Sequence, residues 1–198
     1  MAEKDDVPVI DLKYAFPVRL HVAADRAIEV LPSATLGPSD GFLVNVAGEQ
    51  QLIPYRIYNP EPRRTWRLFR SRDVSLITHC IYSRHHEGLV RERHLRSLVS
   101  AQRDWVVPYV LQLLGEYVVE ILNLLCKRVN ALSGIHYSNF AAHNPAFVQR
   151  TKSRIVSYWH CYYRSEYPNF LQYPGFVVAE SLGWWKPSDL PRLRRRAH

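Results

Sequence analysis

One stretch, residues 73–132, restricts the fold of this chain more than any other, because only there does a long apolar periodicity run through the sequence. In its second half, steps of three and four residues place the apolar positions on one face of a helix. These positions are Val118, Ile121, Leu122, Leu125, Val129 and Leu132. Lys127 and Arg128 follow in the last turns, where a cation suits the helix dipole. The spacing predicts an amphipathic helix over 118–132.

A second helix is predicted just before it. Asp104 can cap its start, and Pro108 lies in or near the first turn, where its missing N–H costs least. Gly115 is a natural C-terminal stop. The first half of the stretch repeats this arrangement, with a helix over 73–85, a turn at 86–88 and a helix over 89–99. We therefore expect two helical hairpins in tandem.

Two phrases in this stretch carry a family resemblance. Gly88-Leu89-Val90-Arg91-Glu92-Arg93-His94-Leu95 resembles the start of the second helix of a HEAT-type repeat, and Gly115-Glu116-Tyr117-Val118-Val119-Glu120-Ile121-Leu122 resembles a degenerate second copy. Glu120 stands where the family usually has arginine, and His94 stands where it prefers alanine. The resemblance implies a curved stack of helix pairs that presents a binding surface. Without it, the hairpins are the core of an ordinary helical domain.

A membrane span is the other alternative for this region. Residues 105–125 have the length of a transmembrane helix but contain Glu116 and Glu120. Each carboxylate costs about 2.5–3.5 kcal/mol at the centre of a bilayer. Pro108 and Gly115 also interrupt the segment, so we expect no membrane span.

Residues 1–70 have a different character, since seven of the thirteen prolines lie there. The sequence predicts one short helix near 23–31 and two short strands, 42–46 and 51–58, joined by a turn at 47–50. Pro54 marks the second strand as an edge strand or a bulged one. We expect two parts: a proline-rich N-terminal segment with a short β-hairpin over 1–70, and an α-helical domain over 71–198. Whether residues 1–70 fold independently is left open.

A basic and aromatic cluster follows the proline-rich connector. Arg63, Arg64, Arg67, Arg70 and Arg72 are interleaved with Trp66 and Phe69. Arginine beside aromatic residues suits phosphate contact and base stacking, and it equally suits an acidic protein. The simpler interpretation is a solvated lead-in to the next helix, with Trp66 and Phe69 docked on the core.

The C-terminal part predicts a loop over 133–143 that contains Gly134, and then two further helices. Asn144 and Pro145 begin one that runs to about residue 165, with Phe147, Thr151, Ile155, Tyr158, Trp159 and Tyr162 on its buried side. A short helix over 175–182 follows and ends at Gly183. The pair Trp184-Trp185 anchors a tail or an interface, and residues 192–196 are rich in arginine.

Composition limits the classes of partner. The net charge of +8 attracts polyanions such as nucleic acid or anionic lipid, and it also fits an acidic protein. The three cysteines, Cys80, Cys126 and Cys161, are far apart and odd in number, which indicates free thiols in a reducing compartment. The acidic N-terminus has no signal-peptide pattern, and we expect a cytoplasmic protein.

No pattern of catalytic residues selects a reaction. His79, Cys80, His85, His86 and Glu87 lie close together, but their spacing matches no recurrent metal site. Glu116 and Glu120 are one helical turn apart, and we expect both to lie toward the solvent edge of their helix. The phosphate-loop, dinucleotide, serine-hydrolase and zinc-protease motifs are absent from the sequence. We therefore expect no cofactor and no metal, and a protein that is not an enzyme; a site built from separated His and Glu residues is left open.

The sequence thus predicts a mainly α protein of antiparallel, HEAT-like helical hairpins with a small N-terminal β or extended segment. Its expected function is non-enzymatic binding or scaffolding, in which it docks another protein, as a subunit of a larger assembly. The alternative is nucleic-acid binding through a basic surface. The oligomeric state is left open. The residues expected to bind are Arg63, Arg64, Trp66, Arg67, Arg70, Arg91, Arg93, Arg150, Lys152 and Arg154.

Overall fold

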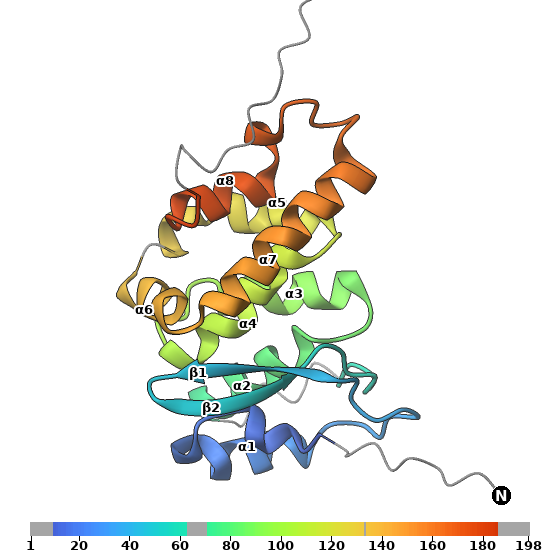
Figure 1. Cartoon of the computed structure of the whole chain (residues 1–198). Helices are drawn as coiled ribbons and strands as arrows, with labels where there is room; N and C mark the ends of the chain where they lie inside the picture. The colour runs from blue at the N-terminus through green and yellow to red at the C-terminus, as the bar shows by residue number, and fades with distance from the viewer. Residues whose placement is uncertain (1–9, 63–70, 133, 186–198) are drawn as a thin grey trace, which may run out of the picture.

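The computed structural model describes residues 10–62, 71–132 and 134–185 (Figure 1). Over these residues the protein is mainly α-helical and has a small two-stranded sheet, as the sequence predicts. In Figure 1 the helix His21–Ile28 (α1) lies beside the sheet at one end of the molecule, and most of the other helices lie on the opposite side of the sheet. The predicted division into parts 1–70 and 71–198 stays a prediction.

The N-terminal segment contains the predicted short helix and hairpin. Two 3-10 turns, Leu12–Ala15 and Val18–Leu20, lead into α1, His21–Ile28. Strand β1, Gly41–Val46, pairs antiparallel with β2, Glu49–Pro54, in a register that sets Val46 opposite Glu49. The tight turn needs positive φ at Ala47 (52°) and Gly48 (91°), and glycine adopts this conformation without steric cost. Pro54 is the last residue of β2, where its missing N–H does not interrupt the hydrogen bonds between the two strands.

The first helical pair of the central stretch is confirmed. Helix α2, Arg72–Tyr82, and helix α3, Gly88–Leu98, pack against each other. The Ser71 hydroxyl caps α2 by accepting a hydrogen bond from the Val74 N–H. Residues 83–87 connect the two helices, and His85 in this connection pairs with Ile57, just after β2.

The second pair differs from the expected continuous helices. A 3-10 turn, Asp104–Val106, precedes α4, Val107–Gln112, and another, Leu113–Gly115, follows it. Helix α5 covers Val119–Lys127, and a separate 3-10 turn covers Val129–Leu132. The apolar positions still face inward, because a 3-10 turn has nearly the same period as an α-helix. Asp104 does not cap α4; its carboxylate pairs with Arg19 instead.

The last two helices lie close to where the sequence predicts them, but the helix before them occupies residues that the sequence predicts as a loop. Helix α6, Ile135–His143, is followed by α7, Pro145–Tyr158, which continues as a π-helical turn, Trp159–Tyr163. Another 3-10 turn, Phe170–Gln172, leads to α8, Pro174–Ser181, and Gly183 follows it with φ of 73°. Positive φ at this position is typical of a helix C-terminal stop.

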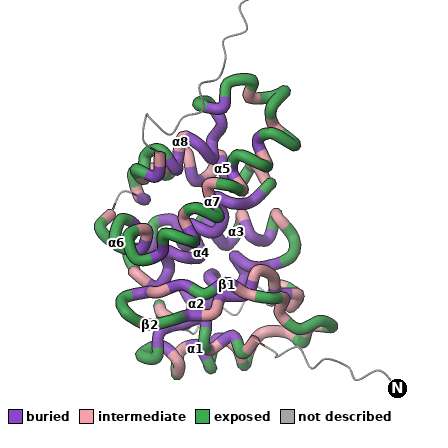
Figure 2. Tube along the Cα trace, viewed as in Figure 1, coloured by how far each residue is buried: buried purple, intermediate pink, exposed green. Residues whose placement is uncertain are grey.

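One hydrophobic core joins the hairpin to the helices. Its buried side chains come from α1, both strands and α2 to α8, and Figure 2 marks the buried positions along these elements in purple. Phe16 stacks on Tyr109 of α4 at a ring distance of 5.4 Å, and Phe42 of β1 lies 5.7 Å from Phe147 of α7. The N-terminal segment therefore packs through aromatic side chains onto the helical part.

The described part of the chain contains no helix that could span a membrane. Across residues 10–62, 71–132 and 134–185, every helix is too short or too polar to cross a bilayer.

Candidate functional site

The most unusual polar arrangement in the structure surrounds Glu116. This carboxylate is 3% exposed and accepts hydrogen bonds from three guanidinium groups. Arg56 binds it through both terminal nitrogens at 3.0 and 2.8 Å, Arg84 through one at 3.0 Å, and Arg91 through one at 3.2 Å. Arg84 and Arg91 are fully buried, and Arg56 is 27% exposed. We call these four residues the Glu116 cluster.

Four separate segments bring these side chains together. Arg56 follows β2, Arg84 follows α2, Arg91 lies in the first turns of α3, and Glu116 lies between the turn Leu113–Gly115 and α5. Arg91 also holds the connection before its own helix, since its Nη1 donates to the carbonyls of His85 and His86, each at 2.8 Å. The cluster therefore joins the hairpin, α2, α3 and the loop before α5.

The sequence prediction for Glu116 was wrong. We expected it at the solvent edge of the same helix as Glu120, but it lies just past the helix end predicted at Gly115, has an extended backbone and is buried. That conformation turns its side chain toward the arginines, while Glu120 stays exposed. The sequence contains no local signal for this, because Arg56 and Arg84 lie 60 and 32 residues away.

The charges of the cluster do not balance. Three guanidinium groups and one carboxylate give a formal charge of +2, and the buried members Arg84, Arg91 and Glu116 alone give +1. Burial lowers the pKa of Arg84 to about 10; Glu116 opposes this shift, and Arg56 and Arg91 add to it. Burial lowers the pKa of Arg91 as well. Among the described residues, Arg84 Nε and Nη1 and Arg91 Nε form no hydrogen bond. A charge that is buried without a counter-ion lowers the stability of the fold. The excess positive charge of the cluster therefore requires an explanation.

Two arginines of α7 reach the edge of the cluster through Tyr55. Arg150 Nη1 donates to the Tyr55 hydroxyl at 2.9 Å, and the Arg154 guanidinium lies 5.0 Å from the centre of the Tyr55 ring. Tyr55 precedes Arg56 in the chain, and its carbonyl accepts a hydrogen bond from Arg56 at 2.7 Å. The Arg154 side chain also crosses Gly115, where a Cβ atom would lie 3.1 Å from Arg154 Cδ. Glycine thus lets this arginine approach the residue next to Glu116.

A stripe of aromatic residues continues from these arginines along α7. Arg150, Arg154 and Tyr158 are four residues apart, and Tyr162 follows in the π-helical turn. The rings of Tyr117, Tyr158 and Tyr162 lie next to one another, with 6.1 to 6.4 Å between the ring centres. Tyr117 is 50% exposed and Tyr162 is 64% exposed. We call these five residues the Arg/Tyr stripe.

Tyr162 corrects a second expectation. The sequence predicted it on the buried side of α7, with Phe147, Thr151, Ile155, Tyr158 and Trp159. Phe147, Thr151, Ile155 and Trp159 are buried, and Tyr158 is partly buried. The π-helical turn widens the helix after Tyr158, so that Tyr162 no longer keeps the α-helical phase and faces solvent.

The predicted binding residues lie in several places. Arg63, Arg64, Trp66, Arg67 and Arg70 lie outside the described residues. Arg91 belongs to the buried Glu116 cluster, and Arg93 pairs with Glu61. Lys152 lies 4.9 Å above the ring of Trp185, whereas Arg150 and Arg154 meet at Tyr55. Of the described members, only Arg150 and Arg154 come together at a common residue, and sequence reasoning missed Arg56, Arg84 and Tyr55.

The histidines of α2 and α3 form a separate chain of contacts. Nδ1 of His79 lies 2.9 Å from Nδ1 of His94, and His94 Nε2 lies 3.0 Å from a Glu61 carboxylate oxygen. Burial raises the pKa of Glu61, but hydrogen bonds from His94 and Arg93 outweigh it and lower the pKa overall. Over the described parts of the chain, no three His, Cys, Asp or Glu side chains are arranged to hold a metal ion.

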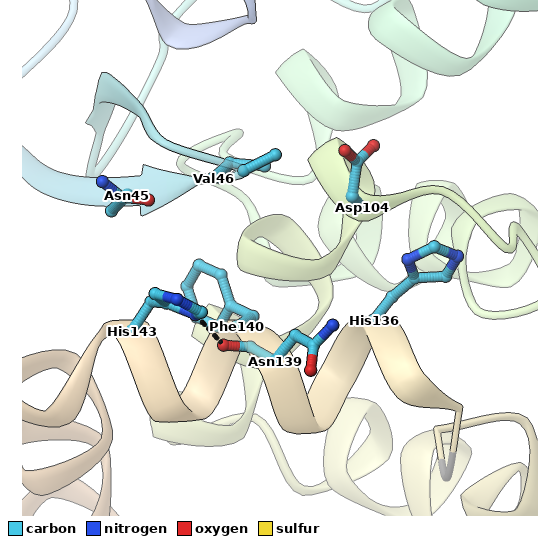
Figure 3. A pocket seen from close by; sticks show the side chains of 8 residues that line it. Asn45, Val46, Asp104, His136, Asn139, Phe140 and His143 are labelled. Atoms are coloured by element: carbon cyan, nitrogen blue, oxygen red, sulfur yellow. Dashed lines mark hydrogen bonds between the residues drawn. The ribbon is translucent and has the colours of Figure 1, made fainter.

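A pocket of about 230 Å³ lies between the hairpin turn and α6 (Figure 3). Its polar lining includes Asp104, His136, Asn139 and His143. Arg19 already binds the Asp104 carboxylate at 2.9 and 3.1 Å, and His143 Nδ1 donates to the Asn139 carbonyl of its own helix. The Asp104 carboxylate and the His143 ring are therefore already engaged within the protein.

Comparison with known proteins does not identify the chain. No protein-family model matches it, and no curated protein or solved structure is significantly similar to it.

Proposed function

We propose that this chain is a non-enzymatic binding protein that docks an acidic protein partner through the Arg/Tyr stripe. The observation that carries the proposal is the exposure of Tyr117 and Tyr162 beside Arg150 and Arg154. Tyrosine and arginine are enriched at the centres of protein interfaces, because each combines a large apolar area with a polar end. The net charge of +8 favours an acidic partner.

The placement of the basic residues also supports a protein partner. A nucleic-acid surface requires many cations that follow one path of phosphates. Here Arg91 is buried, Arg93 is paired with Glu61, and Lys152 lies over Trp185. The HEAT-like arrangement of the α2–α3 and α4–α5 pairs and the cytoplasmic location remain part of this proposal.

Nucleic acid is the second candidate, because exposed tyrosines on and beside the helix that carries Arg150 and Arg154 also suit the stacking of single-stranded bases. Titration with labelled single-stranded DNA or RNA at about 50 and 200 mM salt separates the two functions. Micromolar binding that falls steeply with salt, and that is lost on replacing Tyr117 and Tyr162 by alanine, would favour nucleic acid.

Site-specific photocrosslinking tests the protein interface directly. A benzophenone amino acid replaces Tyr162 in one variant and Tyr14, which is 58% exposed and precedes α1, in a matched control. In extracts of cells that make the protein, we expect Tyr162 to crosslink to one discrete protein and Tyr14 to none. The purified partner should then bind the wild type in calorimetry and lose affinity at least tenfold for Tyr117→Ala/Tyr162→Ala. Equal crosslinking from both positions would contradict the proposal.

A further inference from the structure

Five arginine side chains gather around a single carboxylate. Arg56, Arg84 and Arg91 bind Glu116 directly. Arg150 and Arg154 adjoin them through Tyr55, as described above. The five guanidinium groups and Glu116 give a formal charge of +4. Glu116 already accepts four hydrogen bonds, two on each oxygen, which fills its lone-pair positions.

The outer arginines retain donors that the protein does not use. Among the described residues, Arg154 forms no hydrogen bond and only stacks on Tyr55, and Arg150 forms one. Arg150 is exposed and Arg154 partly exposed, so solvent reaches both. Arg56 is 27% exposed, and its Nη1 also donates to the Tyr55 carbonyl. The buried arginines Arg84 and Arg91 add positive potential that water and salt screen weakly.

We propose that Arg56, Arg150 and Arg154 form a binding site for a phosphate group carried by a small molecule, either inorganic phosphate or a phosphate monoester. Arginine forks match the tetrahedral oxygens of phosphate and bind two at a time. A phosphate monoester carries a charge of about −1.5 to −2 at pH 7, which offsets the +2 of the Glu116 cluster. A carboxylate or one phosphodiester carries only −1. The inference goes beyond partner docking, since it requires no macromolecule.

Calorimetric titration of the full chain tests the site. The probes are inorganic phosphate and phenyl phosphate, with glutarate and a dT15 oligonucleotide as competitors of other chemistry, all at constant ionic strength. We expect saturable binding of both phosphates at millimolar or lower concentration. Arg150→Gln/Arg154→Gln should weaken it at least tenfold. Lys152→Gln/Arg164→Gln is the matched control, because it removes the same charge from the same helical segment without touching Tyr55.

Each of the following three outcomes would contradict the proposed phosphate site. Equal weakening in the two double variants would mean general electrostatic attraction. Binding of glutarate as tight as that of phosphate would mean a carboxylate site, and binding of dT15 without phosphate binding would mean a nucleic-acid surface. Circular dichroism of both variants confirms that they are folded before titration. Crosslinking from Tyr162 is a separate readout, so failure of phosphate binding leaves the docking proposal to its own test.

Discussion

Among single side chains of this protein, Glu116 is the one whose loss we expect to lower the stability of the fold most. It is the carboxylate that neutralises part of the charge of Arg56, Arg84 and Arg91. Removing one member of a buried ion cluster costs more than the cluster contributes, because the remaining charges stay buried without a counter-ion.

Replacing Glu116 by glutamine should therefore destabilise the protein by about 3–5 kcal/mol. Glu120→Gln is the matched control, since Glu120 is exposed four residues later, and its effect should stay within about 0.5 kcal/mol. Urea unfolding followed by circular dichroism measures both values. A similar, small loss in the two variants would show that the arginines do not depend on Glu116.

His85 should make stability depend on pH. It is buried, and its Nδ1 accepts a hydrogen bond from the Glu87 N–H, which needs the neutral ring. Burial lowers the pKa of His85 below 6.5, and the neighbouring His86 lowers it further. The unfolded state then binds more protons than the folded state below about pH 6.5, so this contribution to stability is present above that pH and is lost as the pH falls through the folded pKa.

The variant His85→Asn keeps an acceptor for Glu87 but cannot titrate. We expect its urea midpoint to fall less than that of the wild type between pH 7.5 and 5.5. His86→Asn, at an exposed neighbouring position, removes only the smaller His86 contribution and should retain most of the wild-type dependence. Identical pH slopes for His85→Asn and the wild type would rule out a contribution from His85.

At the scale of single elements, the sequence was most informative where one residue type fixes the backbone. Pro145 at the start of α7, the Ala47–Gly48 turn and Gly183 after α8 lie where the sequence predicts them. Helix α6, the end of α5 at Lys127 and the π-helical turn at 159–163 were missed. Apolar spacing reports which side of a segment is buried, and a 3-10 or π turn preserves enough of that spacing to look like a continuous helix.

Asn144 shows how two elements are joined by polar contacts that sequence patterns do not contain. Its side-chain oxygen accepts from the Asn45 N–H of β1 at 2.7 Å, and its amide nitrogen donates to the carbonyls of Asn45 and Phe140 at 2.8 and 2.9 Å. The sequence predicted this residue as a cap of α7, but its side chain forms no hydrogen bond there and instead connects β1 to the end of α6.

Replacing Asn144 by alanine should leave three backbone groups without their partner and cost about 1–3 kcal/mol. The control is Asn139→Ala, at an exposed position of α6, with an effect within about 0.5 kcal/mol. Thermal unfolding measures the loss. Hydrogen exchange at the Asn45 amide should accelerate more than exchange at amides of α8 if Asn144 specifically secures the hairpin; uniform acceleration would argue against that role.

At the scale of the whole molecule, residues 1–70 and 71–198 share contacts that neither part can replace. Phe16 stacks on Tyr109, the Tyr109 hydroxyl donates to the Ala15 carbonyl at 2.7 Å, and Arg56 completes the ion cluster of Glu116. These contacts cannot be predicted from the sequence of either part alone, because each one joins residues more than 50 positions apart. They imply that folding of the two parts is coupled.

The full chain should therefore unfold in one cooperative transition, with coincident midpoints by far-ultraviolet circular dichroism and tryptophan fluorescence. A fragment of residues 71–198 should lose that transition, because it exposes the surface of Tyr109 and Phe147 and leaves Glu116 with two arginines instead of three. Adding the 1–70 peptide should restore the transition by refilling that surface. A fragment that unfolds as sharply as the full chain would instead make 71–198 an independent domain, and would place the hairpin in the role of an attached cap.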